Sequence, residues 1–432
     1  MSGGGFFPTS GGGGASTFDA TVGATGADYT TIKAAIDAGK YRLLVIDNTT
    51  ETADVAFGDN DTYIFVQENA IVDMVTYKFT DSAAHKHTFT GDMGEITFSY
   101  STSTTLTDFT DGGSLILEGV YFDNNSTAGV SNVYKSTTTP LDYVYINNCR
   151  FDVPNVALQD NITIGNPLTN KGNFMSNCSF YGEGSNSRLF TVNADGIASN
   201  IRVYGGISTL SGITLSGQLN GLNIYDTNAG GLIFVTGGSV TENIYVHGSS
   251  SDVNISVQGT MSLSNVDIGD GSIDMGNNDS CNINNIYCDT IDMSDGGMYD
   301  NRFSNIYLSG KIQHLGGRFN YFSNLRVQGT AYLNGKENSF SNCSFNGAVS
   351  LGSTGDRIRF NNCSFLSSSG ITIPSGADGI GFNNCQVGTD GGGATTITVA
   401  SGSNKTRIIG CTATAAISDA GTGTVDLGNT EF

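Results

Sequence analysis

Residues 339–365 read SFSNCSFNGAVSLGSTGDRIRFNNCSF, a stretch that opens and closes on nearly the same heptapeptide. A third copy, NFMSNCSF, lies far upstream at 173–180. Tracking Asn or Gly followed by Cys, Ile, Val or Leu gives a series from Asn177 to Asn384 in steps of 18 to 23 residues. So regular a period identifies an internal repeat, and the repeat decides the fold.

Within each repeat the apolar residues alternate, which is typical of strands rather than helices. A second strand follows the Asn by about half a repeat, as in Ile273-Asp274-Met275 and Ile291-Asp292-Met293, and a Phe lies two residues before the Asn in several repeats, as at Phe340. Three short strands per repeat predict an all-β solenoid, a parallel β-helix. About fourteen coils at a spacing of about 4.8 Å give a rod roughly 65 Å long.

The cysteines follow the same repeat. Six of the eight occupy the position directly after the repeated Asn or Gly, which holds Ile, Leu or Val in other coils. A position that accepts Cys and Ile alike is a small apolar core position. We therefore predict buried, reduced thiols rather than disulfides or a metal site, in keeping with assembly in a reducing cytosol. These six residues are Cys149, Cys178, Cys343, Cys363, Cys385 and Cys411.

The repeated Asn suits a tight corner, because Asn tolerates the left-handed backbone conformation. Stacked in successive coils, the side-chain amides can also bond one another, so we expect an inward-facing asparagine ladder. Asn177, Asn342 and Asn362 match the glycosylation sequence Asn-x-Ser, but we expect these corners to be buried and unmodified.

Composition and charge restrict the function. The chain has 59 Gly and 5 Pro in 432 residues, and 40 acidic against 19 basic residues give a net charge of −21. Such a surface repels nucleic acid and anionic membranes. No stretch approaches the roughly 18 apolar residues of a membrane span, and residues 1–17 lack the features of a secretory signal, so we expect synthesis and assembly in a cytosol unless a leader was removed. GADGIG at 376–381 lacks the surrounding βαβ unit of a dinucleotide site, and we expect no cofactor.

With this Asn repeat, and with GADYTTIKAAIDAGKYRLLVIDN at 26–48, the chain resembles the pectin-lyase-like superfamily of right-handed, single-stranded parallel β-helices, which includes bacteriophage tailspikes. The resemblance covers roughly residues 20–415. In the quoted stretch a short helix is expected to begin near Thr30 or Thr31, to bury Ile32, Ala35 and Ile36, and to stop at Gly39. The resemblance implies that this helix caps the open N-terminal end of the rod.

The predicted organisation has four parts: a Gly-rich arm at 1–17, a cap with irregular first coils at 18–110, the regular β-helix at 111–415 and a tail at 416–432. The resemblance implies a virion-associated spike or fibre, assembled in the host cytoplasm. It would be a homotrimer that docks on the tail or baseplate through the arm and binds a host surface polysaccharide. An extracellular or cell-surface location is the alternative.

The acidic residues include a candidate catalytic pair. The chain has no Trp, no Asp-Asp pair and no Gly-His-Gly, so the motifs of the polygalacturonase and pectate-lyase branches are absent. Asp274 and Asp292 lie at the same position of consecutive repeats, and two carboxylates roughly 5 Å apart suit a retaining glycosidase. The alternative is that they only decorate the surface of an acidic protein.

A candidate glycan-binding row lies two residues after the repeated Asn. Aromatic faces and polar side chains aligned along a rod could stack on and bond to sugar rings, although a stabilising cross-strand ladder or a subunit contact would look the same. The row consists of Arg202, Asn223, Tyr245, Asp267, Tyr287, Tyr307 and Arg326. We expect the four histidines, His85, His87, His247 and His314, to be surface residues without a metal.

Three functions remain open from the sequence. The first is a virion-associated spike that binds a host polysaccharide, and the second is a glycan depolymerase, a hydrolase or a lyase, on the same rod. The third is a purely structural virion or surface protein.

Overall fold

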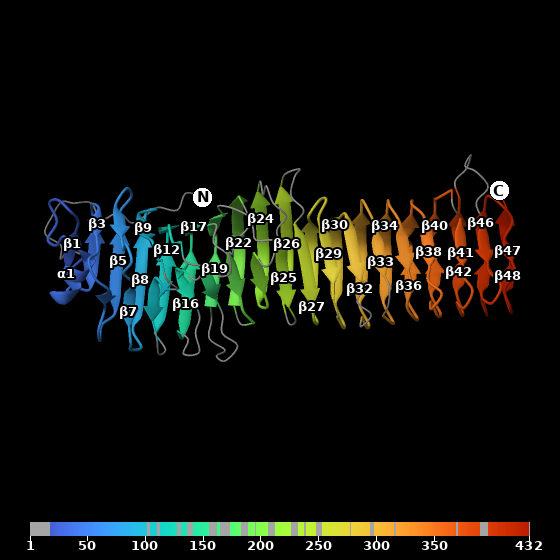
Figure 1. The fold of residues 1–432 in the computed structure, drawn as a ribbon, viewed down its shortest axis with the longest axis horizontal. Helices are drawn as coiled ribbons and strands as arrows, with labels where there is room; N and C mark the ends of the chain where they lie inside the picture. The colour runs from blue at the N-terminus through green and yellow to red at the C-terminus, as the bar shows by residue number, and fades with distance from the viewer. Residues whose placement is uncertain are drawn as a thin grey trace.

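The computed structural model describes residues 18–101, 104–109, 113–127, 131–135, 141–154, 162–164, 173–182, 189–194, 196–205, 212–225, 232–236, 239–247, 253–276, 278–293, 298–314, 317–368, 370–388 and 396–431. The chain forms a right-handed parallel β-helix of about 15 turns, which confirms the predicted fold class (Figure 1). The coils stack along one long axis, with helix α1 at the N-terminal end and β47 and β48 at the C-terminal end. The predicted arm at 1–17 lies outside the described residues.

The strands that precede the repeated Asn form what we call the first sheet, in which each strand pairs in parallel with the next coil. The strands confined to it are β1 (Ala20–Val22), β2 (Arg42–Val45), β5 (Thr62–Val66), β8 (Lys86–Gly91), β12 (Ser114–Glu118), β16 (Tyr143–Asn147), β19 (Asn173–Ser176), β36 (Ser339–Ser341), β39 (Arg359–Asn361), β42 (Gly381–Asn383), β45 (Arg407–Ile409) and β48 (Val425–Leu427).

The strands that follow the Asn form the second sheet. Those confined to it are β3 (Thr49–Thr50), β6 (Ile71–Asp73), β9 (Glu95–Phe98), β13 (Tyr121–Asn124), β17 (Arg150–Val153), β20 (Ser179–Gly182), β37 (Ser344–Phe345), β40 (Ser364–Phe365), β43 (Gln386–Val387), β46 (Thr412–Ala413) and β49 (Thr430–Glu431). Seven longer strands bend at the corner and belong to both sheets: β22 (Gly196–Gly205), β24 (Gln218–Tyr225), β26 (Val240–His247), β28 (Ser262–Asp267), β30 (Asn282–Cys288), β32 (Arg302–Leu308) and β34 (Tyr321–Val327).

The second strand of each predicted repeat belongs to a separate third sheet of 14 strands. They are β15 (Tyr134–Lys135), β18 (Ile162–Ile164), β21 (Phe190–Val192), β23 (Ile213–Leu215), β25 (Leu232–Thr236), β27 (Asn254–Gln258), β29 (Ser272–Met275), β31 (Thr290–Met293), β33 (Ile312–His314), β35 (Ala331–Leu333), β38 (Val349–Leu351), β41 (Ile371–Ile373), β44 (Ile397–Val399) and β47 (Ser418–Asp419). Two small sheets lie in the first coils: β4 (Val55–Ala56), β7 (Phe79–Asp81) and β11 (Thr107–Phe109), and the pair β10 (Thr104–Thr105) and β14 (Ser131–Asn132).

Helix α1 (Ile32–Asp37) forms where the sequence predicts it. Thr31 is its N-cap, and the Thr31 hydroxyl accepts a hydrogen bond from the backbone N–H of Ala34 at 3.1 Å. Ile32, Ala35 and Ile36 are buried in the core. Gly39 follows the helix with a φ of 73°, a left-handed conformation that commonly ends helices and that Gly adopts without steric cost.

The corner Asn residues adopt the predicted left-handed conformation, with φ between 51° and 60° from Asn148 to Asn384. Their predicted burial is wrong: Asn177, Asn342 and Asn362 are exposed, because a left-handed residue at this bend points its side chain out of the rod. The amides do bond one another from coil to coil, for example Asn324 Nδ2 to Asn305 Oδ1 at 2.9 Å. They form an outer amide ladder, so the Asn-x-Ser sequences are not shielded from glycosylation by burial.

An inner amide ladder comes from asparagines that the sequence reading missed. Asn301, Asn320 and Asn338 lie four residues before a corner Asn and are at most 1 % exposed. Asn301 Nδ2 donates to Asn320 Oδ1 at 3.0 Å, and the backbone N–H of Asn320 donates to Asn338 Oδ1 at 3.0 Å. Their carboxamides therefore satisfy backbone groups inside the rod, where water cannot.

The interior is otherwise apolar and stacked in columns. Phe303, Phe322, Phe340, Phe360 and Phe382 form one column with ring centroids 4.6 to 5.1 Å apart. All eight cysteines are free and buried, which confirms the predicted core position. Cys343, Cys363, Cys385 and Cys411 lie in register in four successive coils.

Candidate functional site

The predicted row of outward residues is a continuous column on the exterior of the second sheet. Strand register pairs Arg202 with Asn223, Asn223 with Tyr245, and so on through Asp267, Tyr287, Tyr307 and Arg326. The structure therefore brings all seven residues together along one face. It does so because each lies two residues after a left-handed corner.

Aspartate replaces an aromatic ring at one level of this column. Tyr287 and Tyr307 stack with ring centroids 5.1 Å apart and planes 3° apart, which is one ring per coil. Tyr245 and Tyr287 are two coils apart, with Asp267 between them, so their spacing is roughly 9.5 Å at the usual strand separation. That gap leaves room for one more ring between the two tyrosines.

This gap is a measurable groove, which we call the slot. It is an open hollow of about 340 Å³ lined by Tyr245, Val266, Asp267, Ile286, Tyr287 and the corner residues Asn265, Asn285 and Asn305. Tyr245 and Tyr287 are 39 % and 42 % exposed, among the most exposed aromatic side chains of the described chain. The slot thus offers two aromatic faces, a carboxylate and an edge of amides.

The amides along the edge of the slot are held in place by one another. Asn265 Nδ2 donates to Asn243 Oδ1 at 3.0 Å, and Asn285 Nδ2 donates to Asn265 Oδ1 at 2.9 Å. Asp267 Oδ1 accepts from the backbone N–H of Gly269 at 3.3 Å. These bonds fix the polar groups before any ligand arrives, which lowers the entropy cost of binding.

The two arginines of the row lie on either side of the slot. The Arg326 guanidinium lies over the ring of Tyr307, with Cζ 5.5 Å from the centroid, a cation–π contact. Arg202 is exposed and lies two coils before Tyr245. Both can donate hydrogen bonds to a ligand that extends along the rod beyond the slot.

A closed stack on the same exterior was missed by the sequence reading. The Arg150 guanidinium lies between the rings of Tyr121 and Tyr181, 4.5 and 4.2 Å from their centroids. Asp152 binds Arg150 through two hydrogen bonds of 3.1 Å and accepts from the Tyr121 hydroxyl at 2.6 Å. Burial, together with Asp152, raises the pKa of Tyr121. The signal was the shared position of YFD at 121–123, RFD at 150–152 and SFY at 179–181.

The predicted catalytic pair lies on a different face. Asp274 and Asp292 are in register on β29 and β31 of the third sheet, as predicted, with Asp274 exposed and Asp292 half-buried. The slot belongs to the second sheet, so the structure does not unite the two predicted sites. A glycan cleaved at the aspartates would need contacts of its own on the third sheet.

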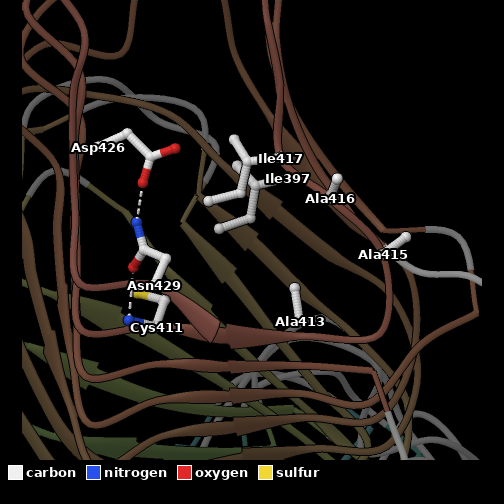
Figure 2. Close-up of a pocket in the computed structure, with 8 residues that line it drawn as sticks. All are labelled: Ile397, Cys411, Ala413, Ala415, Ala416, Ile417, Asp426 and Asn429. Carbon is white, nitrogen blue, oxygen red and sulfur yellow. Dashed lines mark hydrogen bonds between the residues drawn. The ribbon is translucent and has the colours of Figure 1, made fainter. Parts of the chain in front are cut away.

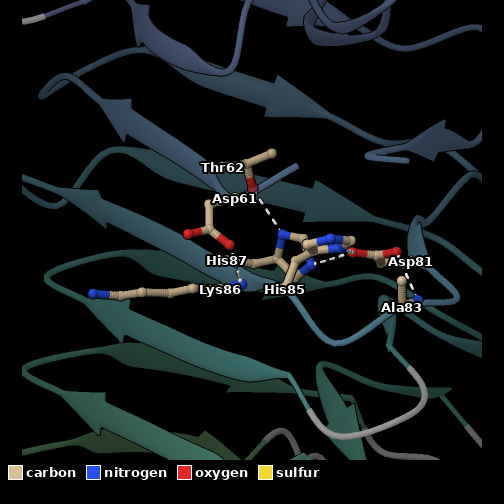
Figure 3. A network of polar contacts seen from close by, with 7 residues as sticks. All are labelled: Asp61, Thr62, Asp81, Ala83, His85, Lys86 and His87. Atoms are coloured by element: carbon tan, nitrogen blue, oxygen red, sulfur yellow. Dashed lines mark hydrogen bonds and ion pairs between the residues drawn. The ribbon is translucent and has the colours of Figure 1, made fainter. Parts of the chain in front are cut away.

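The predicted surface position of the histidines is wrong for His87, which is 1 % exposed (Figure 3). Its Nε2 lies 2.8 Å from Asp81 Oδ2, and its Nδ1 lies 2.9 Å from the Thr62 hydroxyl. His85 Nδ1 contacts the same Asp81 oxygen at 2.9 Å. Alternation puts His87 inward on β8, where Phe57 and Phe109 flank its ring.

This cluster has the order hydroxyl, imidazole, carboxylate of a hydrolytic triad. The Thr62 hydroxyl could not reach a substrate, because Thr62 is 3 % exposed and lies inside the rod. Burial lowers the pKa of His87, with the charge of Asp81 opposing. We interpret the cluster as a buried structural network. The side chains of His247 and His314 lie outside the described part of the structure.

A hollow of about 180 Å³ lies at the C-terminal end of the rod (Figure 2). Ile397, Ala413 and Ile417 line it, and Asn429 closes one side by accepting from the backbone N–H of Cys411 at 2.6 Å and donating to Asp426. It lies inside the rod, between the last two coils that the structure describes. Its one carboxylate, Asp426, accepts a hydrogen bond from Asn429, and we assign the hollow no function.

No group of three His, Cys, Asp or Glu side chains within the described residues is placed to hold a metal ion. Within the same residues, no helix has the length and apolar character needed to cross a membrane. Comparison with known proteins adds nothing further: no family profile matches the chain, and neither the curated proteins nor the solved structures searched contain a match.

Proposed function

We propose that the protein binds a polysaccharide on the exterior of its second sheet, with one sugar ring held in the slot. The observation that carries this proposal is the gap at Asp267 between Tyr245 and Tyr287. A pyranose has apolar faces and a polar rim. Its faces would lie against the two tyrosine rings, while Asp267 and the edge amides would bond its hydroxyls.

The length of the column suits a polymer better than a single sugar. From Arg202 to Arg326 the row spans seven consecutive coils, so that successive sugars can contact successive rungs. An open groove on a rigid rod gives weak contact per sugar but many contacts per chain. The proposal therefore assigns the protein to the binding of extended surface glycans.

The biological setting that we propose is a virion-associated spike or fibre of the pectin-lyase-like, tailspike type. The protein would act as a homotrimer docked on a tail or baseplate through residues 1–17, and its ligand would be a host surface polysaccharide. The β-helix fold and the resemblance of the Asn repeat support this setting. Sedimentation of the purified protein tests the trimer.

Binding can be tested with an array of bacterial capsular and lipopolysaccharide glycans. We expect Tyr245→Ala with Tyr287→Ala to lower affinity for the retained glycan at least roughly tenfold, since each lost stacking face costs on the order of 1 kcal/mol. Tyr332→Ala is the matched control, because Tyr332 is 41 % exposed on the third sheet. Unchanged binding in the double variant would remove the slot as the site.

A glycan depolymerase, a hydrolase or a lyase, is the second candidate, favoured by the register of Asp274 with Asp292. Incubation with the retained glycan, followed by size-exclusion chromatography, detects shortened chains. We expect Asp274→Asn and Asp292→Asn each to abolish such cleavage and to leave binding at the slot unchanged. Cleavage that survives both substitutions rules out this pair. Failure of every glycan to bind or to be cleaved would leave a purely structural role.

A further inference from the structure

Aromatic and arginine side chains gather at the corner that precedes the first sheet. Tyr299, Phe319 and Tyr321 are 45 %, 45 % and 47 % exposed, and Arg302 and Arg318 are exposed beside them. Register makes them neighbours, since Tyr299 bridges to Arg318 and Arg302 pairs with Tyr321. We call these five residues the corner patch.

Phe319 contributes little to the stability of the fold. It has a φ of 58°, a left-handed conformation that is unfavourable for a bulky side chain, and its ring is exposed. The same corner holds Asp300, Glu337 and Gly379 in other coils, so the fold accepts small or polar residues there. An exposed ring at a strained position is a feature of binding sites.

The arginines of the corner patch differ from the other cations of this corner. In the following coils Lys336 pairs with Asp356 at 3.0 Å, and Arg357 pairs with Glu337. Among the described residues, neither Arg302 nor Arg318 forms an ion pair with a carboxylate. Their charges are therefore available to an external anion.

The charge along the chain supports an anionic ligand at this place. Residues 298–432 carry nine Lys and Arg against eight Asp and Glu, whereas residues 1–297 carry ten against thirty-two. Residues 298–432 therefore repel a polyanion much less than residues 1–297 do. The corner patch lies at the start of residues 298–432.

The corner patch adjoins the row that contains the slot. On β32, Arg302 faces out from the first sheet and Tyr307 from the second, on either side of the corner Asn305. On β34 the order is reversed, with Tyr321 before the corner and Arg326 after it. A glycan in the slot can therefore pass over the corner onto the patch within one or two coils.

We infer that the corner patch binds acidic groups of the polysaccharide, so that the ligand is an anionic glycan. The inference rests on the proposed function and adds the class of ligand. The guanidinium groups of Arg302 and Arg318 would pair with carboxylates, sulfates or phosphates on the sugars. The rings of Tyr299, Phe319 and Tyr321 would lie against the sugar faces.

The test uses the full-length protein and matched polymers. Hyaluronate, alginate and acidic capsular polysaccharides are each compared with their carboxyl-reduced, neutral counterparts, and dextran sulfate is compared with dextran. We expect the wild-type protein to bind an acidic polymer roughly tenfold or more tightly than its neutral counterpart, with affinity falling as salt is raised. Which acidic polymer is retained tells carboxylate from sulfate.

Two double variants separate the inference from the proposed function. Arg302→Gln with Arg318→Gln should lower affinity for the acidic polymer roughly tenfold and leave affinity for the neutral counterpart unchanged. Tyr245→Ala with Tyr287→Ala should lower affinity for both polymers. Lys405→Gln is the control, because Lys405 lies at the same corner and is already paired with Asp378 at 3.8 Å.

The remaining outcomes overturn one proposal or both. If the arginine variant binds the acidic polymer as the wild type does, the inference is wrong and the proposed function stands. If the arginine variant instead turns an oligomer into a monomer in sedimentation, the corner patch is an interface with a second copy, and the inference is wrong. If the wild type retains no polymer of either kind, both proposals are wrong.

Discussion

The interior of the first coils differs from the interior of the coils after residue 298. In the first coils, ionisable groups are buried: Glu51, Asp81 and His87 are all at most 6 % exposed. The later coils hold the Phe column, the inner amide ladder and the four thiols that lie in register, and their buried polar groups are mostly amides and hydroxyls. Both ends have an apolar core, but buried charged groups occur in the first coils and stacked neutral side chains dominate the later ones, so different treatments should weaken each end.

Glu51 shows how the first coils use a buried charge. Its two carboxylate oxygens accept from the backbone N–H groups of Ile32 and Lys33 at 2.7 and 3.1 Å, at the start of α1. Burial raises the pKa of Glu51, against these bonds. A buried carboxylate thus attaches the terminal helix to the first coil, whereas the later coils attach to one another through repeated identical contacts.

The largest expected effect is on the Phe column. Phe340→Ala removes a ring that stacks on Phe322 and Phe360 at 4.6 and 5.1 Å, and should lower the free energy of unfolding by about 3–5 kcal/mol. Urea unfolding followed by circular dichroism measures the change. Phe340→Leu, which keeps most of the volume, should cost much less, and equal losses for the two variants would contradict the packing argument.

The inner amide ladder comes next. Asn320→Ala leaves the backbone N–H and the side-chain amide of Asn301 without the oxygen they now share, at 3.2 and 3.0 Å, which should cost about 1–3 kcal/mol. The same urea experiment applies, with Asn361→Ala on the rod exterior as the control. A control as destabilised as Asn320→Ala would show that burial of the amide is unimportant.

The first coils should respond to pH through His87. Its folded pKa lies below the ordinary value of 6.5, so as pH falls the unfolded chain takes up a proton first. Stability is then full above about pH 6.5 and declines as pH drops toward the folded pKa, by at most about 1.4 kcal/mol per pH unit. Unfolding at about pH 7.5 and pH 5.5 should show a steeper loss in the wild type than in His87→Gln. Parallel curves would exclude this residue as the cause.

The smallest effect is expected at the Asn corners, which occur from Asn148 to Asn384. Asn324 has a φ of 54°, a left-handed conformation that Ala adopts less readily than Asn. Asn324→Ala also removes the hydrogen bond to Asn305, so the free energy of unfolding should fall by about 1–2 kcal/mol. Asn324→Gly keeps the conformation and should recover most of that loss. A thermal melt compares the two variants. A Gly variant less stable than the Ala variant would mean that the side-chain bond outweighs the backbone strain.

The repeat allowed the coils, the strand register and the outward column to be predicted, because Asn, or Gly in its place, marks one corner of each coil from Asn148 onward. The direction of the corner amides was mispredicted, since stacking of Asn side chains is possible on either side of a bend. Asn320 was missed because its spacing repeats in only three coils. His87 was misplaced because the alternation in β8 sets a face but does not say which face is the core.

The candidate site was predicted in part. The column from Arg202 to Arg326 follows from register alone, so the slot was within reach of the sequence once Asp267 is seen to interrupt a run of rings. The corner patch was not, because Tyr299 and Arg318 belong to turns whose pairing no periodic pattern reveals. The sequence did not show that Asp274 and the slot lie on different faces, because the repeat does not reveal which sheet each strand joins.

The direction of the hydrogen bonds has a mechanical consequence. Every strand runs across the rod, so the bonds between coils point along it, and a pull on the two ends loads those bonds in series. The contact that gives way first is then the weakest junction between two coils, and the rod opens there one coil at a time. A sideways load stretches the same bonds on the convex side of the bend, so the weakest junction between two coils also limits the rod in bending.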